Sequence, residues 1–517
     1  MITKHGNISS KILNLSFFNF DGPLIRTDFC HIPASRCDID GNVVELNLRG
    51  FDLQCDIFPS DELAAMSKLQ KLDLSNNRKL VQGVDAISRI SKLLSSVETL
   101  QYFDASNSGI GGLLSTPALC STADRIIKLK LDGNALSGEI PSCLMESPTI
   151  QELSLATNNI SGAIPSLAPN SNMELLSLHT NKLSSEIPRD FFKNGLHLKA
   201  FDIHKNNITG EIPPDVGISS PSLTMLNMAD NSLRGMIPVS LARNAVNLDV
   251  LDLSKNMLNS MPILENGSAS DWTCSELYMF AAYDNQLEGP FPNLSNHPEL
   301  TFLLLQNNYL RGGLPSPING SYGSVRIMNV SNNGFGGEVS ETWLTNTKMF
   351  SGTSQRLLHY LDISYNNISY VGREFIDATN STVDNGNRLM MSGNPVCYQD
   401  TGINTTFDEL EANKFGAFGC IPLCDSFNST NITNACVEKK DSMLYLIDLD
   451  QLQQSSEVSE GLSDSGNDGI TAGAIVGIVF GAIASAFAIG VLSFMVISKR
   501  ESKGAVRQII SELSTTS

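Results

Sequence analysis

Residues able to catalyse a reaction or bind a metal are sparse in this sequence. The 517 residues include seven histidines and ten cysteines. They contain no His-Glu-x-x-His zinc motif, no Gly-x-Ser-x-Gly nucleophile turn, no phosphate-binding loop and no protein-kinase signature. No histidine has a neighbouring motif that would make it a general base. We therefore predict that the chain is not an enzyme and uses no cofactor.

Side chains suited to non-covalent recognition are more prominent. Aromatic residues recur at related positions in the second half of the chain, at Tyr278, Tyr283, Phe302, Tyr360 and Tyr365. Exposed aromatic rings on a rigid surface give a large contact area at little entropic cost, so these residues are candidates for a ligand face. The alternative is that they pack against one another or lie under glycans.

Two histidines form a second candidate. His179 and His204 occupy equivalent positions 25 residues apart, and on neighbouring strands they would lie about 5 Å apart. A pair of this kind could sense pH. Two solvated histidines are the simpler interpretation, and we favour it.

A repeated segment must position these side chains. Its pattern is Leu-x-x-Leu-x-Leu-x-x-Asn-x-Leu-x-Gly-x-Ile-Pro, and it is clearest at 126–141, 150–165, 198–213 and 223–238. Each unit is too small to bury its own apolar residues, so the units must stack. We count thirteen units. They predict an α/β solenoid, a right-handed horseshoe of leucine-rich repeats with a parallel β-sheet on its concave face. Other concave-face residues would be Lys128, Lys130, Asp132, Glu152, Glu174 and Asp202.

The asparagine of each unit has a structural role in this interpretation. Asn134, Asn158, Asn181, Asn206, Asn231 and Asn256 follow one another at intervals of 24, 23, 25, 25 and 25 residues. An amide side chain carries both a donor and an acceptor, so it can bind buried backbone groups where the chain turns.

The residue pattern of the units resembles the plant-type leucine-rich repeat, which is found in receptor kinases, receptor-like proteins and secreted wall-associated inhibitors. The resemblance extends from Cys30 to about Cys436. Its most specific marks are Ser-Gly-Glu-Ile-Pro at 137–141, Thr-Gly-Glu-Ile-Pro at 209–213 and the run from Cys30 to Leu48. It implies an amino-terminal cap closed by Cys30 and Cys37, although the tryptophan usual between those cysteines is missing.

The resemblance also implies a carboxy-terminal cap that begins with Gly-Asn-Pro-Val-Cys at 393–397. Cys397, Cys420, Cys424 and Cys436 fit a cap tied by disulfides, and four cysteines allow three pairings. In a cytosolic protein the same cysteines could instead bind zinc, because Cys420 and Cys424 have an allowed ligand spacing.

The chain beyond the cap changes character. Residues 441–469 are acidic and polar and predict a flexible stalk. Residues 470–497 form 28 uncharged residues, about 42 Å as a helix, which predicts one transmembrane helix. Lys499, Arg500, Lys503 and Arg507 follow directly, so the tail at 498–517 should be cytoplasmic and the repeats extracellular. Within the span, Gly473, Gly477 and Gly481 are spaced for close helix packing.

Two further patterns agree with this topology. All ten cysteines precede the span, as expected where disulfides persist. All Asn-x-Ser/Thr sequons also precede it. The glycosylation candidates are Asn159, Asn207, Asn266, Asn293, Asn319, Asn367, Asn380, Asn404, Asn428 and Asn431.

The predicted organisation is an amino-terminal flank and cap at 1–42, the repeat array at 43–391 and the carboxy-terminal cap at 392–440, followed by the stalk, span and tail. Residues 1–29 contain no convincing secretory signal, so we expect the true start to lie upstream. The rival explanation is a cytosolic protein with a tail anchor.

The resemblance implies a receptor-like protein at the plasma membrane that recognises an extracellular protein, peptide or glycan and signals through a partner receptor kinase. A net charge of −19 argues against a nucleic-acid ligand. The tail is too short to fold into an enzyme by itself. Two alternatives stay open: an adhesion or wall-binding membrane protein without signalling, and a truncated receptor kinase.

Overall fold

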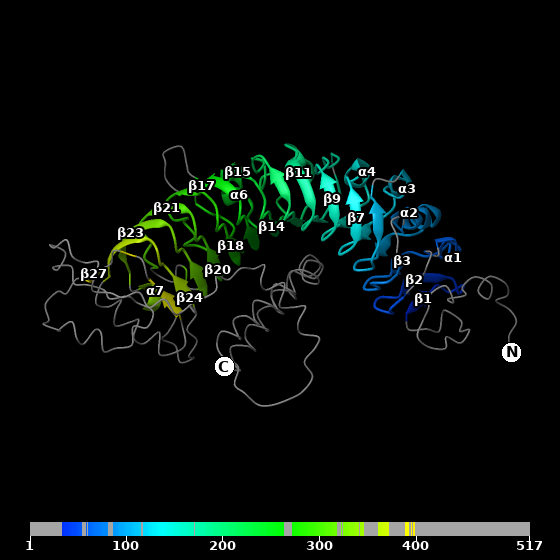
Figure 1. Ribbon diagram of the computed structural model, residues 1–517, viewed down its shortest axis with the longest axis horizontal. Helices are drawn as coiled ribbons and strands as arrows, with labels where there is room; N and C mark the ends of the chain where they lie inside the picture. The colour runs from blue at the N-terminus through cyan, green and yellow to red at the C-terminus, as the bar shows by residue number, and fades with distance from the viewer. Residues whose placement is uncertain are drawn as a thin grey trace, which may run out of the picture.

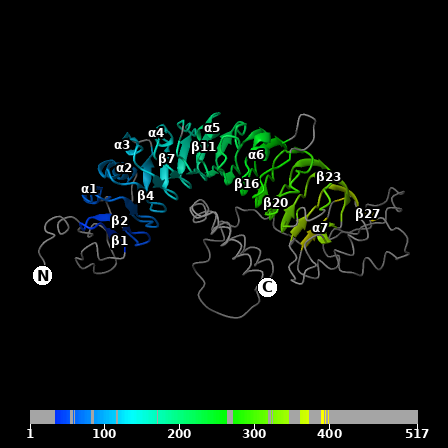
Figure 2. The same ribbon diagram turned by 180° about the vertical axis from the view of Figure 1, so that it is seen from behind.

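The computed structural model describes residues 34–398 except 54–57, 59, 81–85, 115–116, 170, 263–270, 318–321, 323, 341, 346–359, 372–387, 392–393 and 395–396. The described chain forms a curved solenoid, and the strands of one long sheet follow its inner side (Figure 1). The view from behind shows the same arc (Figure 2). The leucine-rich-repeat architecture predicted from the sequence is therefore confirmed.

The concave sheet has fifteen strands within the described residues. The first strand pairs antiparallel with the second, and the others run parallel in chain order, as expected when each repeat contributes one strand. The strands are β1 (Ser35–Cys37), β2 (Val43–Asn47), β3 (Lys71–Asp73), β4 (Tyr102–Asp104), β6 (Lys128–Lys130), β8 (Glu152–Ser154), β10 (Leu175–Ser177), β12 (Ala200–Asp202), β14 (Met225–Asn227), β16 (Val250–Asp252), β18 (Met279–Ala281), β20 (Phe302–Leu304), β22 (Ile327–Asn329), β24 (Tyr360–Asp362) and β26 (Arg388–Met390).

Two further parallel sheets follow the opposite side of the coils. One contains β5 (Gly111–Leu113), β7 (Ala135–Gly138), β9 (Asn159–Gly162), β11 (Lys182–Glu186) and β13 (Asn207–Thr209). The other contains β15 (Arg234–Met236), β17 (Met257–Ser260), β19 (Glu288–Gly289), β21 (Tyr309–Gly312), β23 (Gly334–Val339), β25 (Asn367–Val371) and β27 (Cys397–Tyr398).

Short helices occupy some of the return segments. They are α1 (Ser60–Ala64), α2 (Ala86–Ser96), α3 (Pro117–Cys120), α4 (Ser142–Met145), α5 (Phe191–Asn194), α6 (Val239–Asn244) and α7 (Thr342–Thr345). In α4 and α6 the helix starts directly after the proline of the repeat, Pro141 and Pro238, whose backbone is extended. Proline disfavours continuation of a helix but is tolerated at its start.

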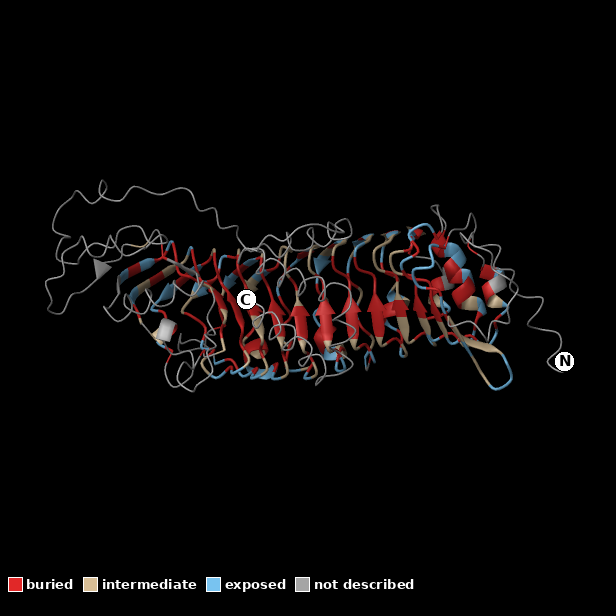
Figure 3. Cartoon of the chain, turned by 90° about the horizontal axis from the view of Figure 1, so that it is seen from below, coloured by how far each residue is buried: buried red, intermediate tan, exposed pale blue. Residues whose placement is uncertain are grey.

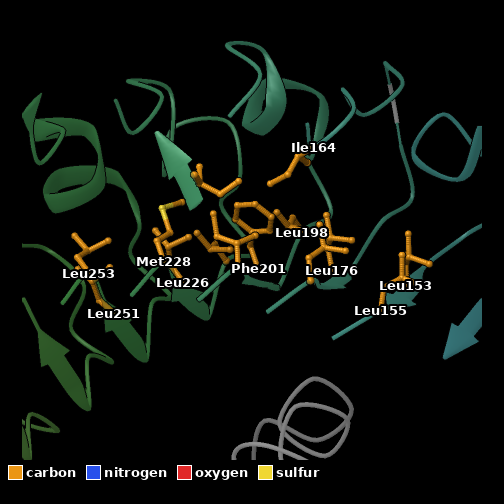
Figure 4. Close-up of a cluster of buried hydrophobic side chains, with 14 of the residues drawn as sticks. Leu153, Leu155, Ile164, Leu176, Leu198, Phe201, Leu226, Met228, Leu251 and Leu253 are labelled. Carbon is orange, nitrogen blue, oxygen red and sulfur yellow. The ribbon is translucent and has the colours of Figure 1, made fainter. Parts of the chain in front are cut away.

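The hydrophobic core lies between the sheets and is continuous along the array. Alternation along each strand supplies it, because every second residue points away from the concave face. Figure 4 shows this for Leu153, Leu176, Phe201, Leu226 and Leu251, which are stacked from one repeat to the next. A core of this kind has no closed centre, so each repeat depends on its neighbours for burial.

The asparagine ladder has the predicted role. Asn158 Nδ2 donates to the carbonyls of Leu131, Leu155 and Ala156, each at 3.0 Å, and its Oδ1 accepts the backbone N–H of Leu136 at 3.0 Å. The same bonds recur at the other ladder asparagines, for example at Asn256. Each side chain therefore bridges two coils.

The ladder continues one step beyond the thirteen units. Asn394 Nδ2 donates to the carbonyls of Ile363 and Met391, and its Oδ1 accepts from the backbone of Asn366 and Ile368. The carboxy-terminal cap predicted at 392–440 includes Asn394, yet the hydrogen bonds of Asn394 are those of a repeat.

No helix among the described residues is both long enough and apolar enough to cross a membrane. The stalk, the apolar segment at 470–497 with Gly473, Gly477 and Gly481, and the tail lie outside the described residues.

Candidate recognition surface on the concave sheet

Eight consecutive strands of the concave sheet begin with an apolar residue that faces away from the core. Register pairing aligns these residues in one row. We call this row the apolar stripe; it consists of Leu175, Ala200, Met225, Val250, Met279, Phe302, Ile327 and Tyr360.

The apolar stripe forms clusters that are separate from the solenoid core. Leu175, Ala200, Met225 and Val250 pack together in one cluster. A second cluster contains Ala281, Tyr283, Phe302, Leu304 and Ile327. The curved sheet brings the side chains of neighbouring strands together on its concave side, and the middle strands are buried when viewed from that side (Figure 3). A solenoid needs no second apolar layer there, because its core is already filled.

The prediction of exposed aromatic rings is wrong for two of the five residues. Tyr283 and Phe302 are only 5% and 6% exposed, because they pack within the second cluster. Tyr278 and Tyr360 are half-buried against the same cluster, and the Tyr278 and Phe302 rings meet edge to face at 5.4 Å. The alternative of mutual packing therefore describes these four rings.

Tyr365 differs from the other four. It is 60% exposed and has a positive φ of 50°, in the residue directly before ladder Asn366. The equivalent residue is in the same left-handed conformation in most repeats, including Thr180 and Lys205. The side chain of Tyr365 therefore lies at the rim of the concave sheet, and alternation along a strand does not predict this position.

The amino-terminal part of the concave sheet is charged but internally paired. Glu152 binds Lys128 at 2.9 Å and Lys130 at 2.5 Å. Burial alone would raise the pKa of Glu152, but the two ammonium groups outweigh it and lower that pKa. Asp132 accepts hydrogen bonds from Ser154 and Ala156, and its burial raises its pKa to about 6. These groups bind each other, which leaves less charge for a ligand.

His179 and His204 are not the two solvated histidines that we favoured. Their rings stack with centroids 4.3 Å apart and planes inclined by 12°. His179 is 7% exposed, and burial lowers its pKa to about 4. Their adjacency was predicted correctly, but their burial was not.

The pair is anchored by a carboxylate. His204 Nδ1 lies 2.7 Å from Asp202 Oδ1. Burial lowers the pKa of His204, and the Asp202 carboxylate more than reverses this effect, so the pKa ends above its ordinary value. Burial raises the pKa of Asp202, but the imidazoles of His204 and His179 bring it below its usual range. The two imidazoles therefore differ, with the pKa of His204 above its ordinary value and the pKa of His179 below it.

The cysteines show one pairing that the sequence did not reveal. Cys120 in α3 and Cys143 in α4 form a disulfide between adjacent repeats. Cys37 is disulfide-bonded, whereas Cys30, Cys420, Cys424 and Cys436 lie outside the described residues. Cys397 is in β27. Repeat register could have indicated the new pair, because both cysteines lie in the return segments of consecutive units.

Four glycosylation candidates fall on described residues. Asn159, Asn207, Asn293 and Asn367 are all exposed. Three of them, Asn159, Asn207 and Asn367, are the first residues of β9, β13 and β25, directly after a ladder asparagine. The remaining candidates, Asn266, Asn319, Asn380, Asn404, Asn428 and Asn431, lie outside the described residues. Asn159, Asn207 and Asn367 thus lie on strands of the two smaller sheets and not on strands of the concave sheet.

Comparison with protein families agrees with the repeat architecture. Residues 171–233 and 354–376 match family models described as leucine-rich repeats. Among curated proteins, Receptor-like protein 54 of Arabidopsis thaliana is 28% identical over 193 residues. That match covers 35% of this chain and 22% of the relative, so the chain spans less than a quarter of the relative's length.

Solved structures show the same fold. The crystal structure of a TDR receptor superposes with a TM-score of 0.55 and 24% identity, covering 70% of this chain and 65% of that one. The ectodomain of the Arabidopsis receptor kinase HAESA, in complex with an IDA peptide hormone ligand, superposes with a TM-score of 0.51 and 21% identity, covering 72% and 73%. The chain therefore has the leucine-rich-repeat fold, and its repeats are similar to those of plant receptor-like proteins.

Proposed function

We propose that this chain is a cell-surface receptor-like protein that binds an extracellular ligand on its concave sheet and signals through a partner kinase. The observation that carries the proposal is the apolar stripe, a continuous apolar row that the solenoid core does not require. Most of these side chains are buried against one another. They form the inner surface of the solenoid, outside its core, which is where a ligand on the concave sheet would lie. The peptide bound to HAESA makes a peptide ligand a reasonable expectation for this fold.

Two features support a location outside the cell. The Cys120–Cys143 disulfide joins neighbouring repeats, and disulfides persist in oxidising compartments. The sequons at Asn159, Asn207, Asn293 and Asn367 are exposed, as an acceptor for a glycan must be. The apolar segment at 470–497 would then anchor the chain in the plasma membrane.

Surface labelling with glycosidase treatment tests this location. The tagged chain would be expressed in plant cells, and intact cells would be treated with a membrane-impermeant biotin reagent. We expect biotinylation of the repeats and a faster-migrating band after glycosidase treatment. A repeat array that is neither labelled nor glycosylated would contradict the proposal and favour the tail-anchored alternative.

A second experiment tests signalling through a partner. In the expected transmembrane helix Gly473, Gly477 and Gly481 share one face, whereas Gly490 lies nine residues further, on the opposite face. We expect replacement of the three glycines by leucine to reduce co-precipitation with receptor kinases from the same membranes, and Gly490→Leu to leave it unchanged. Equal co-precipitation of both variants would favour adhesion without signalling.

A further inference from the structure

The concave face between β10 and β24 has a one-sided charge. Three positions in each repeat point to the concave side. They are the residue of the apolar stripe, which begins the strand, the third residue of the strand and the residue two places after that. No lysine or arginine occupies any of these positions, but Asp202, Asp252 and Asp362 do. The rims of this face are formed by the residue directly before each strand and the residue directly before each ladder asparagine. The charges on the rims balance, with four acidic residues (Glu174, Asp230, Asp249, Asp284) and four basic ones (Lys199, Lys205, Lys255, Arg326). Apart from the Asp202–His204 pair, the centre of the face is therefore negative, and the rims are neutral.

The three carboxylates differ in their partners. Asp202 is paired with His204. Asp362 accepts from Ser364 and from the hydroxyl of Tyr360. Asp252 is 5% exposed, and the bonds found for it in the described chain both come from Ser254, through the backbone N–H and the hydroxyl. Burial without a directly bound cation raises the pKa of Asp252.

An unpaired acceptor lies two strands further along the same face. Gln306 follows Phe302 and Leu304 in the alternation of β20, so its side chain shares their concave side. It is 3% exposed, and its Oε1 has no hydrogen-bond partner in the described part of the chain. A buried acceptor without a donor is costly, and a ligand that supplied a donor would remove that cost.

The shape of this face selects the kind of ligand. The apolar stripe is one side chain wide and follows the inside of an arc, which a planar bilayer cannot reach (Figure 1). The rings of Tyr283 and Phe302 are packed, so they present little open face for stacking on a sugar. An extended peptide fits better, because its alternate side chains can follow the stripe while one of them meets the acceptors.

We propose that the concave face between β14 and β22 binds an extended, partly apolar peptide segment that carries one lysine or arginine. The cationic group lies between Asp252 and Gln306, and the apolar side chains of the peptide cover Met225, Val250, Met279 and Ile327. This inference rests on the proposed function, since it assumes that the concave face binds a ligand. It specifies the charge of that ligand and the two side chains, Asp252 and Gln306, that bind the charged group.

Short synthetic peptides test the inference with the detergent-solubilised full chain. The probe alternates threonine with leucine and carries a single lysine in place of a central leucine. Two matched probes carry leucine or glutamate there. Thermophoresis of the labelled peptides gives the dissociation constants. We expect the lysine peptide to bind about tenfold more tightly than the leucine peptide, as one charge-assisted hydrogen bond allows. We expect the glutamate peptide to bind more weakly than either.

Two variants locate the effect. Asp252→Asn is expected to weaken the lysine peptide about tenfold and to leave the leucine peptide unchanged. Gln306→Met is expected to weaken binding of the lysine peptide several-fold without lowering the melting temperature, because it removes an acceptor that has no hydrogen-bond partner among the described residues. Glu288→Gln removes the same charge from exposed β19 and is expected to change nothing.

The possible failures are distinguishable. Equal affinities for the lysine and leucine peptides would overturn the inference but leave apolar recognition by the stripe intact. A loss in Glu288→Gln as large as that in Asp252→Asn would mean bulk attraction to an acidic protein and would also overturn it. Absence of binding by every peptide would refute it, whereas surface labelling would still decide the location. If Asp252→Asn does not fold, the affinity of Gln306→Met for the lysine peptide decides whether the inference holds.

Discussion

His179 and His204 stack with their ring centroids 4.3 Å apart, on neighbouring coils of the concave sheet. Asp202 binds only the second of them directly, at 2.7 Å. The two imidazoles consequently differ in pKa, with His179 lowered to about 4 and His204 raised. Such a pair links the protonation of the concave face to the stability of two adjacent repeats.

His179→Phe should remove part of the acid sensitivity of the fold. The folded state keeps His179 neutral down to about pH 4, whereas the unfolded chain binds a proton below its ordinary pKa of 6.5. Folding stability attributable to this residue therefore falls as pH decreases from 6.5 to 4, by about 3 kcal/mol. Phenylalanine keeps a ring against His204 but cannot bind a proton. Urea unfolding at several pH values measures the difference.

The control for this prediction is His197→Phe, because His197 is exposed. We expect its stability to follow the wild-type pH profile. If His179→Phe loses as much stability as the wild type between pH 6.5 and 4, the burial of His179 does not cause the acid sensitivity.

Asp202→Asn should lower the folding stability most between acid and neutral pH. The raised pKa of His204 gives stability that is fully present below pH 6.5 and is lost as pH rises through that raised value. The lowered pKa of Asp202 gives stability that is present above pH 3.8 and is lost as pH falls through its lowered value. Removing the carboxylate forces the buried His204 either to lose its proton or to remain an unpaired cation, and breaking a buried pair in this way costs about 3 kcal/mol where His204 would otherwise be protonated.

The same substitution should cost less as pH rises above the raised pKa of His204, because the imidazole then carries no charge to pair. The half-buried rim residue Asp230 supplies the matched variant Asp230→Asn, for which we expect a small loss at every pH. A loss in Asp202→Asn that is independent of pH would contradict the ion-pair explanation.

Asn158→Ala should destabilise the array much more than Asn159→Ala. Asn158 makes four hydrogen bonds to the backbone of two coils, and its removal leaves those groups buried without partners. We expect a loss of about 3 kcal/mol or more. The adjacent Asn159 is exposed, so Asn159→Ala should lower the free energy of unfolding by less than about 0.5 kcal/mol. Denaturant unfolding of the two glycosidase-treated variants makes the comparison, and similar losses would contradict the ladder explanation.

Loss of the disulfide should destabilise the amino-terminal half of the array. Cys120 and Cys143 are separated by 23 residues, and a loop of that length corresponds to about 3 kcal/mol in the chain-entropy treatment. The double variant Cys120→Ala, Cys143→Ala should therefore unfold at a lower temperature than the wild type under non-reducing conditions. Non-reducing peptide mapping should recover the two cysteine peptides as one linked species.

Cys274→Ala supplies the control, because Cys274 is a buried free thiol. We expect the difference in melting temperature between Cys274→Ala and the wild type to be the same with and without reductant. Recovery of Cys120 and Cys143 as free thiols would contradict both this prediction and the extracellular location.

The repeat fold was predictable because its determinants are local and periodic. Leu153, Leu176 and Leu226 are buried for the same reason in each unit, namely that strand alternation turns them inward. Asn158 and Asn256 could be assigned to the ladder from spacing alone. Proximity of His179 and His204 also followed from equal positions in successive units.

The state of the candidate surface was not predictable in the same way. The period places Phe302 and Tyr283 on the concave side but does not say whether they meet solvent, and in the curved sheet they pack into one cluster. The period places Cys120 and Cys143 in the return segments of consecutive units, but only the structure shows that they form a disulfide.

The amino-acid sequence by itself determined which residues face the core, which turn the chain and which line the inner face, because a short period fixes all three. Only the tertiary structure decided which of the inner-face residues touch each other. Those contacts depend on the curvature of the whole array, to which every repeat contributes and which no single repeat encodes. Burial of His179, the pairing of His204 with Asp202 and the unpaired oxygen of Gln306 all follow from that curvature and packing.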